Sequence, residues 1–291
     1  MADDDTVALA ALRGGWQHVP SRLDPVPLGG TAATTWVATV AGACHLVTRV
    51  PLGKRLRLEA GLTAVRHLVE RGLPAGEPVR TLSGALVAEH DGAAYAMVRC
   101  PPGRPLVPRD PIDQQWWGDA LARLHAGMDG FAHAGLAPWH RVRGDAPHLD
   151  AEPWLRPAVA TACAALTRLT VTDRLSYGVL HGRPRAAAFR LDPATGRTAV
   201  ICWGPAATGP LVADLAAAVI HAHDEPTAEL VEGYAAAGAV SRDEIDAALP
   251  VLLRFHWATR ADAAARRLAA VPTDEAARAT LKAARGPLTT A

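Results

Sequence analysis

The sequence predicts an α+β protein in which a small antiparallel β-sheet lobe with one helix precedes a larger, mostly helical lobe. Three observations lead to this prediction. Residues 1–100 hold most of the strand-like runs, which are rich in Thr, Val and Trp. A proline-rich connector at 101–108 follows, as is typical of a boundary between two lobes. Residues 109–291 carry apolar side chains at helical spacing almost throughout.

In the first lobe we expect five strands and one helix. Three strands fall within 26–51, with turns at Gly29-Gly30 and Ala41-Gly42, and two more flank the turn at 90–92. The helix lies between them at 57–74, where apolar side chains recur at helical spacing from Leu58 to Val69. Gly72 and Pro74 should end it.

In the second lobe, one β segment interrupts a run of helices. This segment, 179–204, begins with a short apolar strand and continues as a hairpin of Phe189–Asp192 and Thr198–Trp203 around the turn at 193–196. The helices are expected at 112–128, 154–170, 211–223, 226–238, 242–270 and 273–285.

The composition of the chain excludes some classes of binding partner. Its 291 residues are 49% hydrophobic, enough for a substantial core, and 30 basic against 29 acidic side chains leave no surplus for a nucleic-acid surface. No apolar run reaches the roughly 18 residues of a membrane helix, and the acidic start lacks the basic region of a secretory signal. We therefore expect a cytoplasmic protein with no nucleic-acid or membrane partner.

The four cysteines lie far apart in the sequence and lack metal-ligand spacing. In a chain without a secretory signal, this pattern predicts free thiols. "HAHDE" at 221–225 could suggest a metal site, but His221 and His223 at i and i+2 do not share a helix face. We read it as a helix end that continues, with Asp224, into a loop, and we expect no metal site.

Several short sequence motifs occur in an order that is informative about the fold. They are "YAMVRCPPGRPL" (95–106), "LARLHAG" (121–127), "HG" (181–182) and "GPLVADLAAAV" (209–219). This order resembles the superfamily of aminoglycoside phosphotransferases, choline kinases and type II homoserine kinases. The resemblance covers nearly the whole chain and implies a bilobal protein-kinase-like fold, with a hinge at 101–108.

The resemblance also identifies the positions where catalysis would occur. The family's loop reads H-G-D-x-x-x-x-N, and an I-D-W/F word follows. One Asp positions or deprotonates the attacking hydroxyl, while the Asn and the second Asp hold Mg²⁺. His181 and Gly182 match, but Arg183, Ala188 and Cys202 occupy the three acting positions.

These replacements cannot supply the lost chemistry. An arginine does not take up a proton, an alanine offers no ligand, and a cysteine is a soft ligand poorly suited to Mg²⁺. Asp192 and Asp214 are the nearby acids. We expect Asp192 at the tip of the hairpin and Asp214 in a structural role at a helix N-terminus, so neither should compensate.

The small lobe keeps more of the family's features. Arg49 is the strand position expected to contact phosphates, paired with Glu59 on the next helix; the alternative is an ordinary surface ion pair. Gly29 and Gly30 either cover phosphates or simply form a hairpin turn. Met97 and Arg99, before the hinge, are further candidates for nucleotide or anion binding. The one cofactor we consider is ATP bound without Mg²⁺.

The arginines favour an anionic ligand. Arg183 and Arg185, with Arg49, would line the cleft between the lobes and attract a phosphate, a carboxylate or an acidic peptide. The alternative is that Arg183 is solvated or packed on an aromatic ring. Aminoglycosides are polycations, so such a site argues against them as substrates.

Taken together, the sequence predicts a pseudokinase. It would act as a binding, scaffold or accessory protein for an anionic small molecule, a peptide or a partner enzyme. The alternative is an active ATP-dependent enzyme that phosphorylates an alcohol group of a small molecule through a non-standard site.

Overall fold

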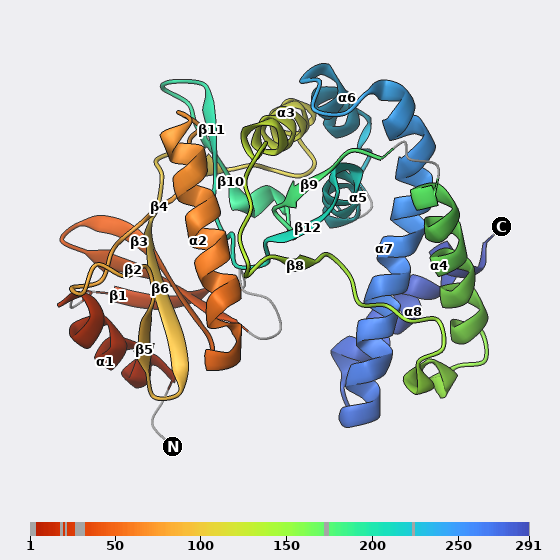
Figure 1. Cartoon of the computed structure of the whole chain (residues 1–291), viewed down its shortest axis with the longest axis horizontal. Coiled ribbons are helices and arrows are strands. Elements are labelled where there is room, and N and C mark those ends of the chain that lie inside the picture. The colour runs from red at the N-terminus through yellow and green to blue at the C-terminus, as the bar shows by residue number, and fades with distance from the viewer. Residues whose placement is uncertain are drawn as a thin grey trace.

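The computed structural model describes residues 4–17, 20, 22–26, 33–171, 175–222 and 225–290. It has a β-sheet lobe and a larger helical lobe, joined by the segment that follows β6 (Figure 1). The turn expected at Gly29-Gly30 lies outside the described residues, as do His223 and Asp224.

The first lobe is built on a six-stranded antiparallel sheet of order β1-β2-β3-β6-β4, with β5 also paired to β6. Two predicted hairpin turns are confirmed. Ala41 and Gly42 join β2 to β3, and Asp91 and Gly92 join β5 to β6, all four with positive φ as a tight two-residue turn requires. The strands are β1 (Arg22–Val26), β2 (Thr34–Val40), β3 (Ala43–Pro51), β4 (Glu77–Pro78), β5 (Ala88–His90) and β6 (Ala93–Arg99).

Two helices cover opposite faces of this sheet (Figure 1). The predicted helix is α2 (Arg55–Glu70), which the short η1 (Leu52–Lys54) precedes. The second, α1 (Asp4–Trp16), corrects the expectation of a single helix. Its residues Leu12 and Trp16 are buried against the sheet, so this acidic segment is anchored by the same kind of apolar packing as α2.

The second lobe contains the helices that the sequence predicts, each within a few residues of its expected ends. The side chains of Asp110, Ser241 and Asp274 cap α3, α7 and α8 respectively by accepting backbone N–H groups. Within the described ranges, no helix combines the length and apolar character needed to cross a membrane. The helices are α3 (Pro111–Gly127), α4 (Leu155–Val171), α5 (Leu211–His221), α6 (Ala228–Ala236), α7 (Arg242–Ala270) and α8 (Glu275–Thr289), with short 3₁₀ turns η2 (Pro147–Ala151) and η3 (Ala186–Ala188).

Short strands support the loop that the sequence singles out. The predicted hairpin forms between β10 and β11, but β11 ends at Val200, so 201–203 is a loop rather than the strand expected there. The connector contributes β7, which pairs with the other edge of β10. These strands are β7 (Arg104–Pro105), β8 (Ala137–Pro138), β9 (Tyr177–Leu180), β10 (Phe189–Asp192), β11 (Arg197–Val200) and β12 (Ala207–Pro210).

The two lobes meet along α2 and the segment that follows it. Val200 donates its N–H to Pro74 O at 3.2 Å and accepts the Gly76 N–H at 3.1 Å, which makes a short parallel bridge between the lobes. At Gly61 of α2, a Cβ atom would lie 2.2 Å from the carbonyl oxygen of Trp203. The backbone of α2 can therefore rest directly on the helical lobe only because residue 61 is glycine.

Candidate functional site

A buried carboxylate holds the start of the loop at 181–188. Asp214, in the first turn of α5, accepts the backbone N–H of His181 at 2.6 Å and that of Gly182 at 3.0 Å. His125 Nε2 lies 3.2 Å from the same carboxylate. We expected Asp214 to bond the N-terminus of its own helix; α5 instead has no side-chain cap, and the carboxylate serves the loop. Its role is to fix the position of residues 181 and 182.

His181 and Gly182 complete this frame. His181 is fully buried with Nε2 2.8 Å from Ile201 O, and burial lowers the pKa of its imidazole, so the neutral ring donates to that carbonyl. Gly182 has φ +78°, and a Cβ there would lie 2.3 Å from Pro205 O. Only glycine fits this position. The loop thus keeps its shape and its tie to 201–205.

The three positions that the resemblance marks as catalytic or metal-binding, 183, 188 and 202, carry no acidic side chain. Arg183 is half-buried, and Ala188 is buried with its carbonyl accepting the Ile201 N–H at 2.9 Å. Cys202 has φ +69°, a conformation in which Asp and Asn are several-fold enriched. Burial raises the pKa of its thiol to about 12, so Cys202 is a protonated thiol at neutral pH.

These residues do not fit Mg²⁺. The ion prefers hard oxygen ligands in an octahedral set, and the methyl group of Ala188 and the neutral thiol of Cys202 provide none. Within the described part of the chain, no group of three or more His, Cys, Asp or Glu side chains is placed to hold a metal ion. No catalytic step through a metal can be built on this site.

A cavity of about 320 Å³ separates the inner face of the sheet from the loop at 201–205. Its walls are mostly apolar, and the described residues that line it include two basic side chains, Lys54 and Arg57, and no carboxylate. Such a space suits a flat apolar ring with an anionic substituent. It is lined by Ala33, Thr35, Leu46, Thr48, Val50, Lys54, Arg57, Leu58, Leu62, Val65, Gly76, Ala96, Val98 and 201–205.

The small-lobe candidates lie elsewhere. Leu46, Thr48 and Val50 of β3 face the cavity, so Arg49 belongs to the opposite face of the sheet, where its Nη1 lies 3.5 Å from Asp4 Oδ1. Met97 is buried on that same face, beneath α1.

The expected Arg49–Glu59 ion pair is wrong. Glu59 pairs instead with Arg55 of its own helix, at 3.1 Å. The physical reason is strand alternation, since a shift of one residue along β3 moves a side chain to the other face of the sheet.

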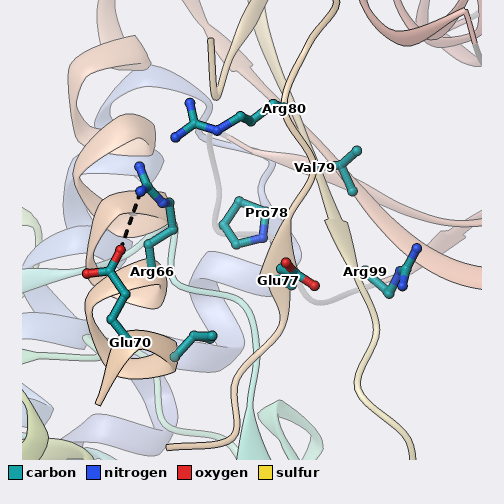
Figure 2. Close-up of a pocket in the computed structure, with 8 residues that line it drawn as sticks. Arg66, Glu70, Glu77, Pro78, Val79, Arg80 and Arg99 are labelled. Atoms are coloured by element: carbon teal, nitrogen blue, oxygen red, sulfur yellow. Dashed lines mark hydrogen bonds and ion pairs between the residues drawn. The ribbon is translucent and has the colours of Figure 1, made fainter. Parts of the chain in front are cut away.

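Arg99 borders a different pocket, shown in Figure 2, of about 560 Å³. Arg66 and Glu70 of α2 form an ion pair at 3.4 Å on one side, and Glu77, Arg80 and Arg99 come from the strand side. None of its lining residues belongs to the loops at 181–188 or 201–205. Arg99 is therefore separate from the loop at 181–188.

A cationic cluster adjoins that loop on the side of the helical lobe. It consists of Arg183, Arg185, His221, His256 and Arg260, all partly buried. The rings of His221 and His256 lie 6.1 Å apart, and the Arg260 guanidinium stacks 4.6 Å over the ring of Trp257. Three segments therefore converge here: the 183–185 loop, the end of α5 and the middle of α7.

Burial is the main influence on the protonation of this cluster: its two histidines are neutral near pH 7, and its three arginines carry the positive charge. Burial lowers the pKa of His221 to about 2, with Arg185 as the next cause, and burial followed by Arg260 lowers that of His256 to about 4. Burial also lowers the pKa of Arg183, Arg185 and Arg260. Among the described residues, no carboxylate contributes to the pKa of Arg185 or of Arg260. The cluster is a ready site for negative charge.

The sequence suggested Arg183 and Arg185 as anion-binding residues but missed His256 and Arg260. The i, i+4 spacing of those two residues on one face of α7 is the only local signal they carry. His221 was considered only with His223, as a rejected metal pair.

Comparison with known proteins agrees with the two-lobed fold and with the loop that Asp214 holds in place. Residues 23–250 match the "Phosphotransferase enzyme family". Homoserine kinase of Methylobacillus glycogenes is 29% identical over 165 residues, covering 55% of this chain and 51% of that protein. Homoserine kinase of Methylobacillus flagellatus is similar at 29% over 162 residues, covering 52% and 49%. The chain thus spans about half the length of these curated relatives.

Solved structures agree with the fold over the whole chain. An amicoumacin kinase in complex with AMP-PNP, Ca²⁺ and "Ami" superposes with a TM-score of 0.76 at 14% identity, covering 98% of this chain and 93% of that one. A microcompartment-associated aminopropanol kinase gives 0.76 at 18% identity, covering 98% and 95%. A choline/ethanolamine kinase family protein from Mesorhizobium loti gives 0.68 at 16%, covering 100% and 96%.

The match over 23–250, the two lobes and the retained loop frame agree with one another. The chain belongs to the phosphotransferase enzyme family, within the superfamily of aminoglycoside phosphotransferases, choline kinases and type II homoserine kinases, and has their bilobal protein-kinase-like fold.

Proposed function

We propose that this protein is a pseudokinase that binds an anionic ligand instead of transferring a phosphoryl group. One observation carries the proposal. The frame of His181, Gly182 and Asp214 is intact, while Arg183 and Cys202 stand where the chemistry needs acids. A guanidinium cannot serve as a base, and phosphoryl transfer depends on groups that act together.

The cationic cluster supports the second half of the proposal. Arg185 and Arg260 present planar guanidinium groups suited to bidentate bonds with a phosphate or carboxylate. Partial burial strengthens such bonds because fewer water molecules compete for the donors. The ligand is an anionic small molecule or an acidic segment of a partner protein. In the second case the protein serves as an accessory subunit.

Active phosphotransfer is the competing function, and kinship with homoserine kinase favours it. It requires a nucleotide in the interlobe cavity. The apolar walls with Lys54 and Arg57 suit ATP bound without Mg²⁺, so nucleotide binding alone does not separate the two functions.

Metal dependence separates them. The melting temperature of the full chain is measured with ATP, with ATP and Mg²⁺, and with ATP and EDTA, and ADP release is followed with a panel of small alcohols. The proposal expects Mg²⁺ to add no stabilisation beyond that of ATP, and ADP release to equal that of Arg183→Ala. Stabilisation that requires Mg²⁺, with ADP release above that of the variant, would establish an active enzyme.

Anion binding is tested by calorimetric titration with inorganic phosphate and with phosphoserine. The expected result is saturable binding that weakens with added salt. If neither anion binds at low salt, the cationic cluster is not a binding site. If phosphoserine binds much more tightly than phosphate, a peptide partner is favoured. If the two affinities are equal, a small-molecule ligand is favoured.

A further inference from the structure

Two cysteines that are distant in the sequence are neighbours in the fold. Cys44 is in β3, and Cys100 follows the last residue of β6. The register of β3 and β6 pairs His45 with Arg99, and the Cys100 N–H donates to Cys44 O at 2.9 Å, so the two cysteines continue the ladder by one step. Their sulfur atoms lie 2.6 Å apart, and both thiols are free.

This geometry needs little change to form a covalent bond. Directly opposed residues of antiparallel strands have Cα atoms about 4.5–5.5 Å apart, which lies within the range that disulfides span. Neither strand has to move for the sulfur atoms to close the remaining distance. We propose that Cys44 and Cys100 form a reversible disulfide, a redox modification site at the point where the sheet lobe passes into the connector.

The two thiols have different roles in this reaction. Cys44 is exposed, so an oxidant in solution reaches it first. Cys100 is half-buried, and burial together with the Cys44 thiol raises its pKa, which keeps it protonated and slow to attack an external disulfide. Cys44 is therefore the attacking thiol and Cys100 the resolving thiol. Arg190, which opposes the rise in this pKa, helps Cys100 to deprotonate for the second step.

With a small-molecule disulfide such as oxidised glutathione as oxidant, the reaction balances in two exchanges. The Cys44 thiolate, having lost its proton to solvent, attacks one glutathione sulfur and releases one glutathione thiolate. The Cys100 thiolate then attacks the Cys44 sulfur of the mixed disulfide and releases the second. Two protein thiols are oxidised, one external disulfide is reduced, and the two departing thiolates take up the two protons.

The other two cysteines, Cys202 and Cys163, serve as comparisons that show whether the cross-link is specific. Cys202 is close enough to Cys100 to contribute to its pKa, so it is the competing partner. Cys163, on α4, has no part in this group and serves as the matched control.

The experiment equilibrates the full-length protein with oxidised glutathione and then counts free thiols and maps peptides under non-reducing conditions. We expect the loss of two thiols per chain, a cross-linked Cys44–Cys100 peptide, and full recovery with excess reduced glutathione. Cys163→Ser should form the same cross-link. Cys44→Ser should show no cross-link.

Three results would overturn the proposal. These are glutathione adducts at Cys44 that never resolve, a Cys100–Cys202 cross-link in the wild type, or an unchanged thiol count. Cross-link mapping on the wild-type protein decides the matter even where a cysteine variant folds poorly. It is also independent of the proposed anion binding, because none of these cysteines belongs to the cationic cluster.

Discussion

The carboxylate of Asp214 accepts the backbone N–H of His181 at 2.6 Å, across 33 residues of sequence. Its second oxygen accepts the next amide, so one buried side chain sets the direction in which the loop leaves β9. The following predictions depend on that loop, on the cluster beside it and on the contact between the lobes.

Asp214→Asn should destabilise the protein by about 2–3 kcal/mol. The side chain of Asn has a single acceptor oxygen, whereas the carboxylate now accepts two backbone N–H groups and contacts His125. Urea unfolding followed by circular dichroism measures this. Asp192→Asn is the control, since Asp192 also accepts backbone and hydroxyl groups but in a partly exposed turn. Its cost should be within about 0.5 kcal/mol. Equal costs would refute the special role of Asp214.

Arg183→Asp alone should not produce turnover. The restored carboxylate would face a site where positions 188 and 202 still provide no metal ligand, and residues that act as a unit do not recover one at a time. Coupled detection of ADP with a panel of alcohols checks this. Mg²⁺-dependent turnover by this single variant would show that other residues already hold the metal.

Arg185→Ala and Arg260→Ala should each weaken phosphate binding at least tenfold. Each removes charge-assisted hydrogen bonds, worth about 1.5–3 kcal/mol. Calorimetry measures the affinity. Arg123→Ala, which removes an exposed arginine paired with Asp119 on α3, is the control for net charge and should change it little. If all three variants lose affinity equally, the effect is one of overall charge.

Stability should fall as the pH drops below about 6.5, in part because of His256. Its pKa in the folded protein is lowered to about 4, so between these values the unfolded chain binds more protons than the folded one. The sign is thus a loss of stability with falling pH. His256→Gln should flatten the slope of unfolding free energy against pH in this window. Parallel slopes for variant and wild type would contradict the lowered pKa.

Gly61→Ala should destabilise by about 1–3 kcal/mol, because its new methyl group meets the backbone of Trp203. Gly286→Ala is the matched control in α8, where a Cβ meets nothing within 4 Å. Helix propensity alone should make that variant more stable by about 0.5–1 kcal/mol. Thermal unfolding of both reports the difference. Equal shifts would mean that α2 can move away from the helical lobe.

The sequence predicted most helices well because their signals are local. Capping by Ser241 and Asp274 and the period of apolar side chains set their ends. The helix α1 was missed because its acidic first turn looks like a solvated tail, and its apolar face has meaning only against the sheet. The face on which Arg49 lies depends on the register of β3, which the sequence pattern did not fix.

The site was only half predictable for a related reason. The interest in positions 183, 188 and 202 follows from a motif in the sequence. Arg260 lies 75 residues after Arg185 in the sequence, and the two come together only because α7 packs on α5. Cys44 and Cys100 show the same limit, since their separation of 56 residues concealed adjacent places in a sheet. Contacts of this kind belong to the tertiary fold and leave no periodic trace.

The bridge of Val200 with Pro74 and Gly76 bears on how the two lobes can move. It crosses between the lobes near the base of α2, while the connector crosses at a second point through β7 and β10. The helix α2 adds further contacts between these two points, because Arg57 donates to Pro205 O at 2.8 Å and Gly61 rests on the backbone of Trp203. We therefore expect little relative motion of the lobes, so a ligand that enters the interlobe cavity would meet walls whose separation is set in advance.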